Sequence, residues 1–236
     1  YTEAYNILVG RLFRAEQLAY YIRAKQTSEI FALQFTATMN KVMLPVMSHF
    51  QKDEVNLRAS YHKVIIITGL INFSVLAFLA SNAESIFVLL YTDRWLFAVP
   101  LFQFLCIDAM FMPLQSMSGN LLIARGKSKY FMYIELVKRV IQAGIIIISL
   151  NSLEYIVYGQ IFTSTLFTLV GFWVVSKEIE YKISEQIKVI IPYLILAIIV
   201  FLSGFLTIEF IHLSYLPGLI LNLFISVSLY ASISYI

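Results

Sequence analysis

Two charged residues stand inside hydrophobic stretches and are the first candidates for chemistry. Lys41 follows Asn40 and precedes Pro45, and Asp108 lies near the middle of a later apolar stretch. A charge near the centre of a bilayer costs roughly 3 kcal/mol, so it should face protein or water. Lys41 is therefore read either as a cavity cation that contacts an anionic ligand, or as a lysine that snorkels from a helix starting later than expected.

Asp108 allows three interpretations that the residues alone leave open. It is a proton-coupling carboxylate, a partner for Lys41, or a structural hydrogen-bonding residue between helices. The chain's single cysteine, Cys106, lies in the same apolar stretch and is expected to be a small packing residue. One cysteine excludes a multi-thiolate metal site. We expect no metal and no cofactor.

The elements that must position these residues are membrane helices. Of the 236 residues, 60% are hydrophobic and 13% are charged, against about 45–50% and about 25% in soluble domains. Four stretches of twenty or more residues contain no Asp, Glu, Lys or Arg: Val64–Ala83, Tyr155–Ser176, Val189–Ile208 and Phe210–Ile236. About 20 apolar residues in a helix cross the hydrocarbon core, whereas a barrel strand would alternate and need only about 10.

The hydropathy pattern predicts about eight hydrophobic segments, an all-α polytopic membrane helix bundle and one transmembrane domain over residues 1–236. The expected segments are Tyr1–Phe13, Ser28–Met47, Val64–Leu90, Leu96–Ala124, Tyr133–Leu150, Tyr155–Ser176, Val189–Ile211 and Leu216–Ile236. The first segment resembles the end of a longer helix, so we expect an N-terminal portion to precede it.

Basic residues are concentrated in alternate loops, which predicts the orientation. Three connections carry nine of them: Lys52, Arg58, Lys63, Arg125, Lys127, Lys129, Lys177, Lys182 and Lys188. The intervening connections carry only Arg94. We therefore expect the basic loops and the C-terminus on the cytoplasmic side.

The first connection breaks this pattern. Arg11, Arg14, Arg23 and Lys25 would lie on the outer side. Either they flank helix ends and snorkel, or they face a water-filled cavity. With Lys41, Asn40 and Asp108, these four residues complete our set of candidates for a substrate cavity.

Four stretches of the chain are similar to motifs of one transporter family: Leu18–Ala24, Pro45–Tyr61, Leu90–Gln103 and Pro113–Ser128. They resemble LGxYxRA, PxxSxxQxDxxxLRxxY, LLGxxWxxAxPLLQ and PLxSxxGNxLxAxGR of the Wzx-type polysaccharide flippases, members of the multidrug/oligosaccharidyl-lipid/polysaccharide exporter superfamily. The resemblance covers roughly Gly10–Arg139. Ala19 replaces a glycine of the first motif, and Tyr91-Thr92 stands where the third has LG.

The resemblance implies the C-terminal half of a transporter built from two pseudo-symmetric helix bundles around a central cavity. It implies flipping of an undecaprenyl-pyrophosphate-linked oligosaccharide across the inner (cytoplasmic) membrane by alternating access, for polysaccharide, O-antigen or capsule biosynthesis. The implied partners are the lipid-linked oligosaccharide and membrane lipids, with proton or sodium coupling left open and no nucleic acid.

Two other functions compete with this interpretation. A drug or cation antiporter of the same superfamily would use intramembrane acids, for which Asp108 is the main support, whereas the basic cluster favours an anionic substrate. A membrane-embedded polysaccharide polymerase would need placed acids or bases, usually on a large outer loop. The sequence has no such loop and no HExxH, GxSxG or Walker A signature, so we expect no enzyme.

Overall fold

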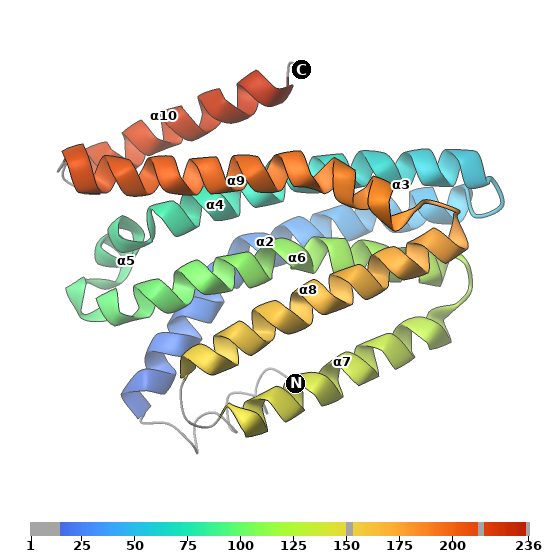
Figure 1. The fold of residues 1–236 in the computed structure, drawn as a ribbon, viewed down its shortest axis with the longest axis horizontal. Helices are drawn as coiled ribbons and strands as arrows, with labels where there is room; N and C mark the ends of the chain where they lie inside the picture. The colour runs from blue at the N-terminus through green and yellow to red at the C-terminus, as the bar shows by residue number, and fades with distance from the viewer. Residues whose placement is uncertain (1–14, 150–152, 212–214, 235–236) are drawn as a thin grey trace.

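The chain folds into a bundle of helices (Figure 1). The computed structural model describes residues 15–149, 153–211 and 215–234, and within these ranges it has no strand. The helices are α2 (Ala15–His49), α3 (Glu54–Thr68), α4 (Ser74–Ser81), α5 (Ala83–Tyr91), α6 (Val99–Ala124), α7 (Ser128–Ile148), α8 (Leu153–Glu178), α9 (Ile183–Ile211) and α10 (Tyr215–Ser234). A π-helical turn, η1 (Gly69–Phe73), joins α3 to α4, and a 3₁₀ turn, η2 (Asp93–Ala98), precedes α6. The expected all-α class is confirmed.

Four helical stretches in the described ranges are long and apolar enough to cross a membrane: Glu54–Ser81, Asp93–Ala124, Leu153–Glu178 and Ile183–Thr207. The chain is therefore a multi-pass membrane protein, as expected. Helix α2 is more polar, but it packs along α6, and α7 packs against α8 and α6 (Figure 1). Helix α2 is not among the four apolar stretches, but because it lies beside the spanning helix α6 we expect it to cross the membrane with that helix.

Two of the expected segment boundaries are wrong. The segment expected at Ser28–Met47 is a helix that begins by Ala15 and ends at His49, so Arg23 and Lys25 lie within a helix and not in a connection. The segment expected at Val64–Leu90 begins at Glu54 and is interrupted by η1 and at Asn82. Tyr1–Phe13, with Arg11, and Arg14 lie outside the described residues.

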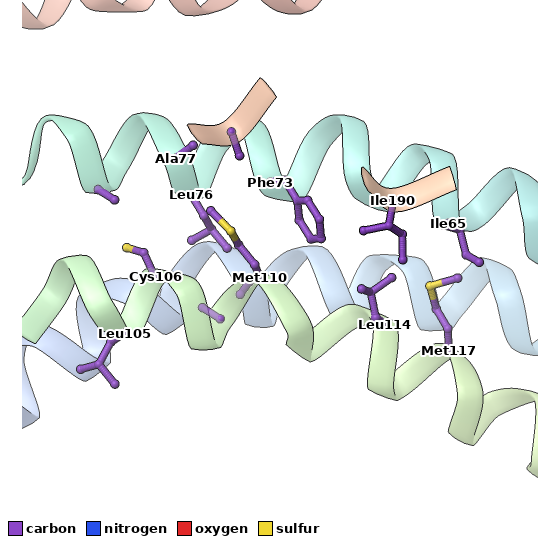
Figure 2. Packing of buried hydrophobic residues seen from close by; sticks show 14 of the residues in the cluster. Ile65, Phe73, Leu76, Ala77, Leu105, Cys106, Met110, Leu114, Met117 and Ile190 are labelled. Carbon is purple, nitrogen blue, oxygen red and sulfur yellow. The ribbon is translucent and has the colours of Figure 1, made fainter. Parts of the chain in front are cut away.

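Helix α6 forms the centre of the bundle. It contacts α2, α4, α7 and α8, and most of its length is buried. Figure 2 shows Leu105, Cys106 and Met110 of α6 among the core residues, with Phe73 of η1 and Leu76 of α4 nearby. Cys106 is fully buried, so its role as a packing residue is confirmed.

Glycines permit close contact between some of these helices. A Cβ added at Gly204 of α9 would lie 2.5 Å from the Cβ of Ser81, and one at Gly171 of α8 would lie 2.6 Å from Ser118 Oγ. Small residues let membrane helices approach closely, and van der Waals contact between them then holds the bundle together.

The three basic connections meet at one end of the bundle, which we call the basic end (Figure 1). Ion pairs join them: Arg125 Nη2 lies 3.4 Å from Glu54 Oε1, and Lys127 Nζ lies 2.6 Å from Glu178 Oε1. The positive-inside pattern therefore grouped these connections correctly, and the orientation of the chain depends on which side of the membrane this end faces.

Candidate functional site

Helix α2 exposes a polar face in the part of the bundle that crosses the membrane. We define this polar face of α2 by four exposed polar residues: Gln34, Thr38, Lys41 and Ser48. Their spacings of four, three and seven residues place them on one side of the helix. Thr38 Oγ1 donates to the backbone oxygen of Gln34 at 2.9 Å, so the Gln34 amide and the Lys41 ammonium are the groups that would lose most in hydrocarbon. Ile30 and Pro45 are exposed on the same side of the helix.

Lys41 lies at the centre of this face but not at the centre of the helix. It stands eight residues before His49, the last residue of α2, which is about 12 Å from the basic end at 1.5 Å per residue. The sequence pattern places it nearer the middle of its segment, because that segment is expected to start at Ser28. Lys41 is exposed and therefore accessible to a ligand from the side of α2 that faces away from α6.

Asn40 points the other way and joins α2 to α6. Its Oδ1 accepts hydrogen bonds from Ser116 Oγ at 2.8 Å and from Asn120 Nδ2 at 2.7 Å. Side-chain hydrogen bonds between membrane helices are worth about 0.6 kcal/mol each on average. Asn40 thus orients the neighbouring Lys41 by fixing the rotation of α2 about its axis.

Asp108 belongs to a second polar group between helices, whose charged members are half-buried and which we call the buried cluster. Ser164 Oγ of α8 donates a hydrogen bond to Asp108 Oδ1. The carboxylate also interacts electrostatically with Lys25 and Glu29 of α2 and with Lys138 of α7. Lys25 Nζ lies 3.9 Å from Glu29 Oε1. Two carboxylates and two ammonium groups from three helices thus balance in formal charge.

Gln115 connects this buried cluster to the helix that carries Lys138. Its Nε2 donates to the backbone oxygen of Ser164 at 2.9 Å and to Thr168 Oγ1 at 3.3 Å, while its Oε1 accepts from Lys138 Nζ. The interpretation of Gln115 as a residue that holds helices together agrees with these contacts. The sequence interpretation missed Glu29 and the inward position of Lys138; the signal available was the spacing of four between Lys25 and Glu29.

The structure does not pair Asp108 with Lys41. Asn40 contacts α6 at Ser116, which is eight residues, or about 12 Å, beyond Asp108 along the helix. Lys41 and Asp108 therefore belong to different parts of the molecule: the first to the exposed polar face of α2, the second to the buried cluster.

Arg23 packs against aromatic rings. Its guanidinium carbon lies 4.9 Å from the ring centroid of Tyr91 and 5.3 Å from that of Trp95. Cation–π contacts contribute about 0.5–2 kcal/mol, more when they are shielded from water. Of the four basic residues expected near the first connection, Arg23 and Lys25 are thus held by rings or carboxylates, and Arg11 and Arg14 lie outside the described residues.

A pocket lies at the end of the bundle opposite the basic end. Its volume is about 800 Å³, and it is lined by aromatic rings, an amide and two carboxylates; the polar and aromatic lining residues are Gln17, Tyr20, Asp93, Phe97, Phe104, Glu154 and Tyr158. Flat apolar rings combined with a few hydrogen-bonding groups suit a small polar ligand such as a saccharide.

Comparison with known proteins supports a role in polysaccharide biosynthesis. A family described as "Polysaccharide biosynthesis protein" matches residues 1–100. The chain is 24% identical over 201 residues to the teichuronic acid biosynthesis protein TuaB of Bacillus subtilis, an alignment that covers 81% of this chain and 40% of TuaB.

Two further relatives are described in related terms. An uncharacterized membrane protein in the cps region of Klebsiella pneumoniae is 31% identical over 103 residues, covering 44% of this chain and 21% of that protein. The lipopolysaccharide biosynthesis protein WzxC of Escherichia coli is 22% identical over 126 residues, covering 53% of this chain and 26% of WzxC. The chain thus spans less than half the length of these relatives. No solved structure matches it.

Proposed function

We propose that the chain belongs to the Wzx-type polysaccharide exporter family and forms part of a flippase for undecaprenyl-pyrophosphate-linked oligosaccharides in the cytoplasmic membrane. The observation that carries the proposal is the polar face of α2. A saccharide cannot cross hydrocarbon unsolvated, so its carrier must present hydrogen-bonding groups along the membrane-spanning part. The polar face of α2 supplies amide, hydroxyl and ammonium groups there.

Each part of the site has a role in this proposal. Lys41 attracts the pyrophosphate or an acidic sugar, since an ammonium in a cavity with low-dielectric walls acts over a long range. Gln34 and Thr38 exchange hydrogen bonds with sugar hydroxyls. The chain matches 40% of TuaB, so in this proposal the rest of the exporter supplies the opposite cavity wall.

The buried cluster supports a separate role in coupling. Asp108 lies among two ammonium groups and a second carboxylate, so a proton or a sodium ion bound there would change the balance of charge between α2, α6 and α7. Within the proposal, this is the position at which an ion would drive alternating access.

The test replaces Lys41 in the complete exporter. Lys41→Gln should lower the rate of flipping of a lipid-linked oligosaccharide in proteoliposomes by about tenfold, because a hydrogen bond to a charged group contributes about 1.5 kcal/mol or more. Lys41→Arg should retain more activity than Lys41→Gln, since it keeps the charge although its geometry differs. Expression and thermal unfolding should stay unchanged, because Lys41 is exposed.

Lys129→Gln is the matched control, since Lys129 is also exposed but lies near the start of α7, away from the polar face of α2. It should flip at the normal rate. Normal flipping by Lys41→Gln would remove this residue from the path, and an equal loss in both variants would show that net charge alone is responsible.

A further inference from the structure

A cleft opens between α3 and α9 at the basic end. Its volume is about 550 Å³. Four basic side chains, a tyrosine, a carboxylate and three small apolar residues line it: Arg58, His62, Lys63, Lys188, Tyr181, Glu185, Val55, Ala59 and Val189. None of these residues belongs to the polar face of α2 or to the buried cluster, so the cleft needs a separate explanation.

One side of the cleft is held in place by polar contacts. Arg58 forms an ion pair with Glu185, and its guanidinium carbon lies 5.0 Å from the ring centroid of Tyr181. The Tyr181 hydroxyl is 2.7 Å from His62 Nδ1. Because these contacts link α3 to α9 and to the connection before it, the cleft keeps its shape without a ligand.

The other basic groups in the cleft have no counter-charge in the described part of the chain. Lys63 on α3 and Lys188 on α9 are exposed, and neither forms an ion pair with a described residue. The negative charge of Glu185 balances the positive charge of Arg58. The two lysines therefore remain as an excess of two positive charges on opposite walls of the cleft. A group with negative charge placed between them would complement both.

The depth of the two lysines is that of a phospholipid headgroup. Each is followed directly by the apolar part of its helix, which begins at Val64 in α3 and at Val189 in α9. Further along, the outer surfaces of these helices expose aliphatic side chains: Ile67, Ile71, Ile191, Ile195 and Ile198. Exposed aliphatic side chains on spanning helices face lipid tails, and basic pockets between membrane helices at this level bind anionic headgroups.

We propose that the cleft between α3 and α9 binds the phosphate of an anionic phospholipid from the surrounding leaflet. Lys63 and Lys188 contact the phosphate from two helices, and the acyl chains lie along the exposed isoleucines. Both lysines are required together, because each wall supplies one. This assignment rests on the charge and the depth of the two lysines and on the shape of the cleft. It does not depend on what the protein transports.

The test measures lipid retention by native mass spectrometry of the whole protein after delipidation and titration with phosphatidylglycerol or phosphatidylcholine. The unmodified protein should retain phosphatidylglycerol and not phosphatidylcholine. The double variant Lys63→Gln/Lys188→Gln should bind phosphatidylglycerol about tenfold more weakly, given a usual contribution of about 1 kcal/mol per lysine near an anionic surface. Lys52→Gln/Lys182→Gln removes the same charge from exposed positions at the same end, outside the cleft.

The control variant should retain phosphatidylglycerol like the unmodified protein. An equal loss of phosphatidylglycerol binding in the two double variants would show that binding depends only on net charge, which would overturn the proposal. A competition arm adds soluble glycerol phosphate: its failure to displace the lipid supports a site that also holds the tails. Displacement at comparable concentration would identify a site for a free phosphate instead.

Discussion

Thr92 has a backbone conformation that a β-branched residue rarely adopts. Its φ is 80° and its ψ is 166°, at the turn between α5 and η2. In the motif that this stretch resembles, the second position of Tyr91-Thr92 is a glycine, which adopts a positive φ without steric cost. The departure from the motif therefore coincides with local backbone strain at this turn.

Replacing Thr92 with glycine should consequently stabilise the protein. Removal of the Cβ relieves a penalty of order 1–3 kcal/mol, partly offset by the larger entropy of glycine in the unfolded chain. We expect a net gain of about 1 kcal/mol, measured as a higher midpoint of thermal unfolding in detergent. Thr92→Ala retains a Cβ and should gain much less; an equal gain from alanine would show that the strain lies elsewhere.

Asp108 allows a test of which lysine balances it. Asp108→Asn leaves Lys25 and Lys138 without their shared carboxylate and should lower the unfolding midpoint, because an uncompensated buried charge is costly. Adding Lys138→Gln should recover part of the loss, with a coupling free energy of about 1 kcal/mol in a double-mutant cycle. Adding Lys41→Gln should recover nothing. Recovery by the Lys41 substitution alone would contradict the separation of the two polar groups.

At the scale of elements, close contact between α9 and α4 depends on Gly204, which has no side chain to separate the two helices. Gly204→Val should force the helices apart, because its Cβ would lie 2.5 Å from that of Ser81. Overpacking costs about 1–3 kcal/mol. Gly144→Val on α7 is the matched control, since an added Cβ there meets nothing within 4 Å. Thermal unfolding of both variants measures the difference, and equal destabilisation would show that the close contact is not limiting.

The sequence predicts the helical elements well where they are uniformly apolar, and poorly where polar residues are satisfied inside the bundle. The hydropathy pattern places the start of α2 at Ser28 because Arg23 and Lys25 resemble residues of a loop. In the structure, aromatic rings and an i, i+4 ion pair accommodate them within the helix. The rings come from α5 and η2, and hydropathy along one stretch of sequence cannot detect them.

The sequence predicts the candidate site only in part, because it does not show how the helices pack against one another. Lys41 and Asp108 stand out as charges within apolar stretches, but their separation depends on how far α2 is displaced along α6. The hydrogen bonds of Asn40 to Ser116 and Asn120 set that displacement. Two helices can slide past each other by whole turns without changing either sequence pattern, so the pairing of residues across them required the structure.

At the scale of the whole molecule, the grouping of basic connections leads to a prediction of orientation. Cysteines placed at Lys127 and Lys182, with Cys106 replaced, should resist an impermeant thiol reagent in intact cells, because the basic end is expected to face the cytoplasm. A cysteine at Arg94, near the opposite end, should be labelled readily. Labelling at Lys127 and Lys182 with protection at Arg94 would reverse the orientation.

The central position of α6 also has a consequence for biogenesis. Helix α2 contacts α6 much more extensively than it contacts α3 or α4, which are synthesised earlier than α6. Asn40 lacks its two described partners until α6 is made, because both of its hydrogen bonds are to that helix. Insertion of α6 joins the earlier helices, after which α8 and α9 can dock on an assembled core. We therefore expect α2 to reach its final packing only after α6 has inserted.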